Sequence, residues 1–79
     1  MPASAPVPEP ALGRLAHRLA ALRHQRGLTY EELAEASGLS RRGVIALERG
    51  ERAGEMRSWY LVAKALGVRF DEFVSVLDD

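Results

Sequence analysis

Two adjacent arginines follow a serine at positions 40–42, and this short run could bind DNA. The guanidinium group of Arg41 or Arg42 can donate two parallel hydrogen bonds to O6 and N7 of a guanine, a contact worth about 1–3 kcal/mol of discrimination between bases. Alternatively, one of the two binds a phosphate. Adjacent residues of a helix point about 100° apart, so the two arginines cannot share one direction. We expect at least one of them to contact a base.

The surrounding residues, 29–50, predict two short helices joined by a tight turn. Thr29 and Glu32 have the spacing of a capping box, which begins the first helix. Gly38 stands where that helix should end, because a glycine takes the left-handed conformation at little cost. Ser40 can cap the second helix. A unit of this kind puts the start of its second helix into the major groove of DNA.

The same stretch resembles the helix-turn-helix of phage repressors of the Cro and C1 type, also called XRE-like regulators. The matching framework positions are Leu33, Ala34, Gly38, Leu39, Ser40, Val44, Leu47, Glu48 and Gly50. The resemblance extends over about residues 11–77. It implies an all-α, five-helix, lambda-repressor-like DNA-binding domain, with the helix-turn-helix at helices 2 and 3 and double-stranded DNA as partner.

The resemblance and the helical geometry together predict the residues that contact DNA. They are Tyr30, Ser40, Arg41, Arg42, Gly43, Ile45, Ala46, Arg49 and Arg52. The family usually has a phosphate-binding glutamine at the position of Tyr30, whose hydroxyl can still donate to a phosphate oxygen. Ile45 stands where serine is frequent, and with Ala46 it would pack on a thymine methyl group. Alternatively, Ile45 turns into the core.

Gly43 weakens the second helix by about 0.5–1 kcal/mol relative to alanine. Among the residues of the second helix that are expected to contact bases, few have polar side chains apart from Ser40 and the two arginines that follow it.

The resemblance also implies a structural ion pair between Arg23, near the end of the first helix, and Glu48, near the end of the third. If the pair is buried, removal of one partner should cost about 3–5 kcal/mol, because the other charge is left without compensation. The alternative is two solvated surface charges, worth about 0–1 kcal/mol.

Hydrophobic spacing predicts three further helices and no strand. The first runs from about Glu9 or Pro10 to Arg26, the second from about 55 to 66, and the third from about 70 to 77. The expected core consists of Leu15, Leu19, Leu22, Leu28, Leu33, Ala34, Leu39, Val44, Leu47, Trp59, Val62 and Leu66.

An apolar face near the C-terminus is expected to form a homodimer interface, because regulators of this kind bind two half-sites as symmetric dimers. We expect Phe70 and Phe73 to turn inward, with Val74 and Leu77 partly at the dimer interface. Alternatively, all four side chains cover the core.

Length and composition fit one small domain, residues 10–79, preceded by a flexible Pro-rich arm at 1–9. The arm carries no Lys or Arg, which argues against a minor-groove contact. The formal net charge is zero, but the charges are unevenly distributed. Arginines dominate 11–27 and 41–57, whereas acids dominate 28–40 and the tail. Lys64 is the only lysine among the eleven cationic side chains, and arginine suits forked contacts to phosphate or guanine.

Several kinds of chemistry find no support in the sequence. There is no cysteine, and His17 and His24 have no third ligand at a suitable spacing. No glycine-rich phosphate loop and no Ser/His/Asp arrangement is present. We therefore predict no metal, no cofactor and no enzymatic activity. No apolar run approaches the ~18–20 residues needed to span a membrane, so no membrane association is expected and the predicted location is cytoplasmic.

Two functional hypotheses remain. The first is a stand-alone, dimeric, sequence-specific transcriptional regulator, such as a repressor, that occupies a roughly palindromic operator and blocks or recruits polymerase. The second is a protein-interaction module, such as the antitoxin of a toxin–antitoxin pair, whose main partner is a protein.

Overall fold

The computed structural model describes residues 9–78, and all regular structure within them is helical. The elements are α1 (Leu12–Gln25), α2 (Tyr30–Ser37), α3 (Arg41–Glu48), α4 (Met56–Ala65), α5 (Phe70–Val74) and a 3₁₀ turn (Ser75–Asp78). The predicted all-α fold of five helices is confirmed. Residues 1–8 of the predicted arm lie outside the described residues, and Glu9 is exposed and not helical.

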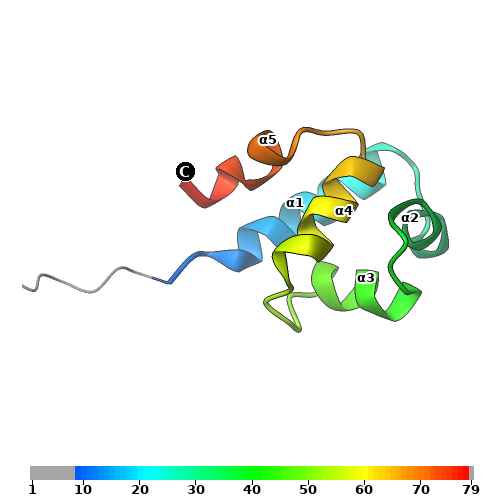
Figure 1. Cartoon of the computed structure of the whole chain (residues 1–79), viewed down its shortest axis with the longest axis horizontal. Coiled ribbons are helices and arrows are strands. Elements are labelled where there is room, and N and C mark those ends of the chain that lie inside the picture. Colours follow the sequence, from blue (N-terminus) through cyan, green and yellow to red (C-terminus); the bar gives the residue numbers. More distant parts are fainter. Residues whose placement is uncertain (1–8, 79) are drawn as a thin grey trace, which may run out of the picture.

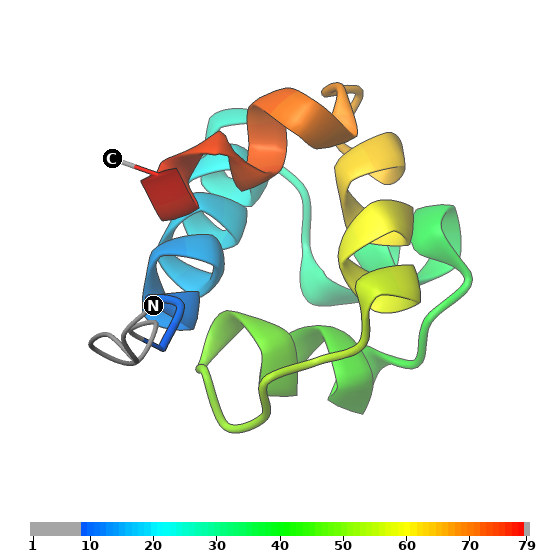
Figure 2. The ribbon, with the colours of Figure 1, turned by 60° about the vertical axis from the view of Figure 1, so that its left-hand side comes forward.

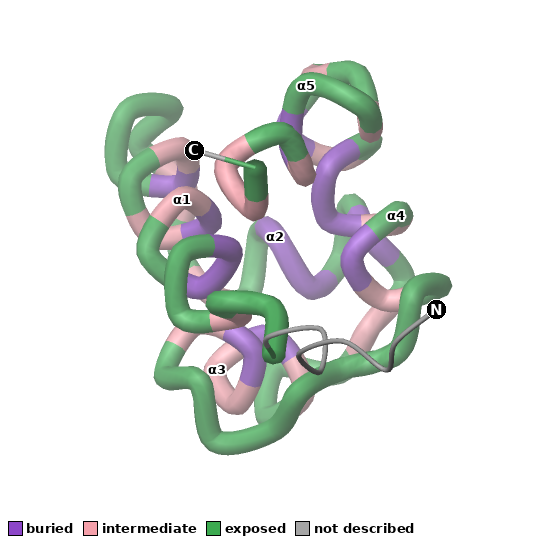
Figure 3. The backbone as a smooth tube through the Cα atoms, turned by 90° about the vertical axis from the view of Figure 1, so that its left-hand side faces the viewer, coloured by how far each residue is buried: buried purple, intermediate pink, exposed green. Residues whose placement is uncertain are grey.

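The helices enclose one core (Figure 1). Figure 2 shows α1 and α4 on opposite sides, with α5 crossing above them and α3 below. The 3₁₀ turn lies along α1, and α2 contacts both α3 and α4. In Figure 3 the buried parts of all five helices face the shared interior. The buried apolar side chains are Leu15, Ala16, Leu19, Leu33, Ala34, Val44, Leu47, Trp59, Val62, Ala63, Leu66 and Phe73.

The predicted core differs from the observed core at its edges. Leu22, Leu28 and Leu39 are only partly buried and pack against the core from outside. The sequence-based list omitted Ala16 and Ala63, which are small enough to lie where helices approach closely. Phe73 was not in that list, but it was expected to turn inward and is fully buried.

Two predicted helix boundaries were wrong. α1 begins at Leu12, not at Glu9 or Pro10. A residue that precedes a proline is disfavoured in the helical conformation, and the N-cap Ala11 has a non-helical ψ of 71°. The last helix does not continue to Leu77 but tightens into a 3₁₀ turn at Ser75. The Ser75 hydroxyl donates to the Glu72 carbonyl at 2.7 Å in this turn.

The loop between α3 and α4 is held against the core by Trp59. Its indole Nε1 donates to the carbonyl of Ala53 at 2.9 Å, and its ring lies 6.0 Å from the ring of Phe73. Gly54 follows directly, with a φ of +80°. A Cβ at this position would lie 2.6 Å from Leu47 Cδ2 and 2.7 Å from Trp59 Nε1, so only glycine fits without a shift.

We predict that Gly54→Ala is more destabilising than Gly67→Ala. Both glycines have a left-handed backbone, with φ of +80° and +76°, so the backbone strain of an alanine is similar at the two sites. A Cβ at Gly67 meets nothing within 4 Å, whereas at Gly54 it must displace Trp59. Gly54→Ala should lose about 1–3 kcal/mol more in the free energy of unfolding, measured by urea denaturation followed by circular dichroism. Equal losses would contradict the close packing at Gly54.

Candidate nucleic-acid interface

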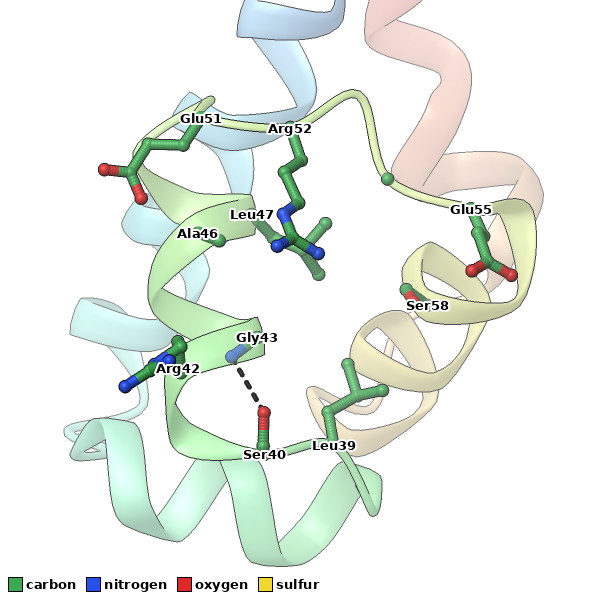
Figure 4. Close-up of a pocket in the computed structure, with 11 residues that line it drawn as sticks. Leu39, Ser40, Arg42, Gly43, Ala46, Leu47, Glu51, Arg52, Glu55 and Ser58 are labelled. Atoms are coloured by element: carbon green, nitrogen blue, oxygen red, sulfur yellow. Dashed lines mark hydrogen bonds between the residues drawn. The ribbon is translucent and has the colours of Figure 1, made fainter.

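The caps predicted at the start of α2 and α3 are present. Thr29 Oγ1 accepts from the Glu32 N–H at 3.1 Å, and the Glu32 side chain accepts from the Thr29 N–H at 2.8 Å. Ser40 Oγ accepts from the Gly43 N–H at 2.9 Å (Figure 4). A Cβ at Gly43 would lie 3.1 Å from that oxygen, so glycine leaves the cap uncrowded. These caps set the directions in which the first turns of the two helices present their side chains.

The turn between α2 and α3 depends on Gly38 and on a residue that sequence reasoning missed. Gly38 ends α2 in the left-handed conformation, as predicted. Ser37 is buried, its hydroxyl donates to the Ala34 carbonyl at 3.3 Å, and its oxygen accepts from the Leu39 N–H at 3.2 Å. A serine directly before a helix-ending glycine is a weak signal, because a hydroxyl there can equally point to solvent.

Arg23 and Glu48 form a bidentate ion pair between the end of α1 and the end of α3. Arg23 Nε donates to Glu48 Oε2 and Arg23 Nη2 to Glu48 Oε1, both at 2.8 Å. Only 10% and 8% of the two side chains are exposed. Arg23 Nη1 also donates to the Leu28 carbonyl at 2.8 Å. The guanidinium therefore joins α1, the following loop and α3.

Tyr30 covers this ion pair from the side of α2. The guanidinium carbon of Arg23 lies 4.3 Å from the centre of the Tyr30 ring, a distance suited to a cation–π interaction. The pKa of Arg23 is raised above its ordinary value, mainly by the hydrogen bond to Glu48 and in part by Tyr30, against the opposing effect of burial. Tyr30 is thus packed against this charged group where α2 begins.

Arg41, the first residue of α3, turns back toward the start of α2. Its Nε donates to Glu31 Oε1 at 2.6 Å, and its guanidinium carbon lies 5.8 Å from the centre of the Tyr30 ring. This contact is at the surface, because 58% of the Arg41 side chain and 62% of the Glu31 side chain are exposed. The hydrogen bond from Arg41 lowers the pKa of Glu31 below its ordinary value.

The other predicted contact residues lie on α3 and in the loop after it. Arg42 is exposed and points outward from α3, away from α4 (Figure 4). Ile45 and Ala46 are half-buried, and Arg49 is exposed directly after the helix. Ile45 therefore keeps part of its surface outside the core.

A cleft of about 510 Å³ separates α3 from the start of α4. Figure 4 shows the guanidinium of Arg52 directed into the space between the two helices, beside Leu47. Gly43 and Ala46 line the α3 side, and Ser58 lines the α4 side. The small side chains at 43 and 46 leave this side of α3 open beside Arg52.

Two negative findings apply to residues 9–78. No helix among them is both long and apolar enough to cross a membrane. Within the same part of the chain, no three His, Cys, Asp or Glu side chains come together in a way that could hold a metal ion.

The arrangement of α2, α3 and the buried ion pair can be compared with known proteins. A family model described as helix-turn-helix matches residues 19–73. The chain belongs to the helix-turn-helix family of Cro/C1-type regulators.

Relatives of this chain are named HTH-type transcriptional regulators. An HTH-type transcriptional regulator of Sinorhizobium fredii, y4dJ, is 42% identical over 60 residues, which cover 76% of this chain and 78% of that protein. An HTH-type transcriptional regulator of Methanothermobacter thermautotrophicus is 40% identical over 57 residues, covering 72% and 83%. The family relationship thus extends over most of both relatives.

Solved structures from the same family have the same fold. The wild-type restriction–modification controller protein C.Esp1396I is similar with a TM-score of 0.76 and 30% sequence identity, and the match covers 85% of this chain and 88% of that one. A single-residue mutant of the same controller protein is similar with a TM-score of 0.77. The predicted family and fold are therefore confirmed.

We predict that Arg23→Ala lowers the free energy of unfolding by about 3–5 kcal/mol, because it leaves the Glu48 carboxylate buried without its partner. Arg69→Ala is the matched control, since it removes an arginine whose pair with Asp71 is 75% and 67% exposed. That control should lose much less, because the attraction within an exposed ion pair is weakened by solvent. Chemical denaturation of both variants, followed by circular dichroism, measures the difference. Similar losses in the two variants would show that the buried pair does not stabilise the fold as argued.

Proposed function

We propose that the protein is a sequence-specific transcriptional regulator that binds a roughly palindromic operator as a dimer, with α3 in the major groove. The observation that carries the proposal is the exposed start of α3, where Arg41 and Arg42 project from a helix whose position is set by the buried Arg23–Glu48 pair. A recognition helix reads base edges mainly through its first residues, so those side chains must be both accessible and well oriented.

Within this proposal the two arginines have different tasks. They follow one another on the helix and therefore point in different directions. At least one forks onto a guanine, and the other can bind a phosphate. Ile45 and Ala46, which are half-buried, pack their exposed parts on thymine methyl groups.

The phosphate contacts come from both sides of α3. Arg49 and Arg52 are exposed in the segment after α3, and their positive charges attract the phosphate backbone of the duplex. On the other side, the oxygen of Ser40 already accepts the capping hydrogen bond, so its hydroxyl hydrogen remains to donate to a phosphate. The Tyr30 hydroxyl is a second donor at the start of α2. These groups position the domain, whereas the base contacts determine sequence preference.

Dimerisation follows from the size of the reading surface. α3 has eight residues and is about 12 Å long, so one copy reaches only a short run of base pairs. A symmetric dimer doubles that run across two half-sites about one helical turn apart. Val74 and Leu77 are half-buried near the C-terminus and are the proposed dimer contacts, while Phe73 is fully buried and unavailable.

The fold similarity to a restriction–modification controller protein makes a comparable regulatory setting the first to test. A restriction or modification enzyme encoded beside this chain would support that setting.

We predict that selection from random duplex oligonucleotides at moderate salt enriches a motif with two-fold symmetry. Arg41→Ala or Arg42→Ala, whichever removes the base contact, should weaken binding to the selected site by about 5- to 150-fold, the equivalent of 1–3 kcal/mol. Arg69→Ala is the control, because Arg69 lies in the loop between α4 and α5, far from α3 in Figure 1. Failure to enrich any motif, together with tight capture of a protein partner, would favour an interaction module such as an antitoxin instead.

We predict that sedimentation equilibrium gives twice the mass of the chain, and that Val74→Asp or Leu77→Asp gives the monomer mass with helical circular dichroism retained. A carboxylate at an apolar interface must be desolvated, which opposes association. Met56→Asp is the control, because Met56 is an exposed apolar residue on α4 with 75% of its surface accessible. Dissociation by Met56→Asp alone would move the interface to α4 and make the proposed contacts wrong.

A further inference from the structure

Arg41 is restrained by two residues of α2 rather than by its own helix. Glu31 accepts a hydrogen bond from its Nε at 2.6 Å, and the Tyr30 ring lies 5.8 Å from its guanidinium carbon. Both restraining residues lie in the first turn of α2, which the Thr29–Glu32 capping box orders. The guanidinium of Arg41 is therefore oriented by a part of the fold that is ten positions away in the sequence.

The geometry of this contact leaves a fork of donors unused. A guanidinium carries five N–H groups in one plane, and Glu31 accepts from the Nε side. The N–H groups on Nη1 and Nη2 that point away from the carboxylate can still donate in parallel to O6 and N7 of a guanine. Because the plane of the Arg41 guanidinium is already oriented, binding to DNA must exclude fewer rotamers of this side chain. This favours a directional contact with a base.

Arg42 differs from Arg41 in this respect. Within residues 9–78 it makes no side-chain hydrogen bond or ion pair, and it points outward from α3 (Figure 4). An unrestrained arginine can reach phosphate oxygens in several positions, and its attraction to the DNA backbone does not depend on base sequence. The two neighbouring arginines thus differ in how well they are oriented before DNA arrives.

We propose that Glu31 is a positioning residue that holds Arg41 as the base-reading arginine, while Arg42 binds the backbone. This inference rests on the proposed DNA-binding function and adds the residue on which guanine preference depends. The Glu31 carboxylate also repels phosphate, so it weakens non-specific binding while it sharpens specific binding. Its removal should therefore lower the ratio of specific to non-specific affinity.

The test compares the parent protein with Glu31→Gln and with Glu35→Gln. Both variants replace an exposed carboxylate of α2 by an amide and change the charge equally, but only Glu31 bonds to Arg41. To find the guanine that Arg41 reads, each guanine of the selected duplex is replaced by adenine. At that guanine the replacement weakens binding of the parent protein but not of Arg41→Ala. The measured quantity is the ratio of dissociation constants for the selected duplex and the same duplex with that guanine replaced.

Glu31→Gln should reduce this ratio about two- to fivefold, the size expected of an exposed ion pair, while affinity for unrelated DNA rises. Glu35→Gln should leave the ratio unchanged. Arg41→Lys keeps the charge but lacks the planar guanidinium that Glu31 orients, so it should reduce the discrimination even with Glu31 present. Circular dichroism of each variant verifies that α2 is intact.

Two results would overturn the inference while leaving the DNA-binding function in place. One is an equal ratio in the parent, Glu31→Gln and Glu35→Gln. The other is a guanine preference that disappears in Arg42→Ala but persists in Arg41→Ala. If the parent itself selects no sequence, the proposed function fails first and the positioning role fails with it.

Discussion

The ion pair between Arg23 and Glu48 is the interaction on which the orientation of α3 depends. Removing two charges from water is costly, and the cost is offset here because Arg23 makes two hydrogen bonds to the carboxylate and a third to the Leu28 carbonyl. These bonds join the end of α1, the loop and the end of α3. Apolar contacts are not directional, whereas a bidentate pair has one good geometry. A buried pair of this kind favours a defined orientation of α3.

The effect of that pair reaches the surface through Tyr30. The Tyr30 ring contacts the buried guanidinium of Arg23 and also lies near the exposed guanidinium of Arg41. The position that commonly holds a phosphate-binding glutamine in the family is therefore also a packing position in this chain. A tyrosine there can stack on two arginines and still keep a hydroxyl for phosphate. Tyr30 thus connects the buried ion pair to the exposed start of α3.

Local features of the fold were predictable because they depend on residues close in sequence. The capping hydrogen bonds at Thr29 and Ser40 join residues three positions apart, and the left-handed Gly38 directly follows the last residue of α2. The start of α1 and the 3₁₀ ending after α5 were not predicted correctly, because helix ends depend on small differences in backbone energy that apolar spacing does not report. The partial exposure of Leu22, Leu28 and Leu39 likewise depends on how the helices cross, which no local pattern specifies.

The sequence by itself determined the five helices and the serine–arginine run that could read DNA, since these follow from caps, periodicity and spacing along the chain. The family followed from the resemblance to Cro/C1-type regulators. The partnership of Arg23 with Glu48 was expected only through the family resemblance, and its burial is a property of the packed helices. Only the tertiary structure decided that Arg41 turns toward Glu31, that Ser37 holds the turn, and that Gly54 lies against Trp59. The physical reason is that these contacts join elements whose relative placement is set by the shared core. The direction of an exposed arginine follows from the neighbours that folding brings to it.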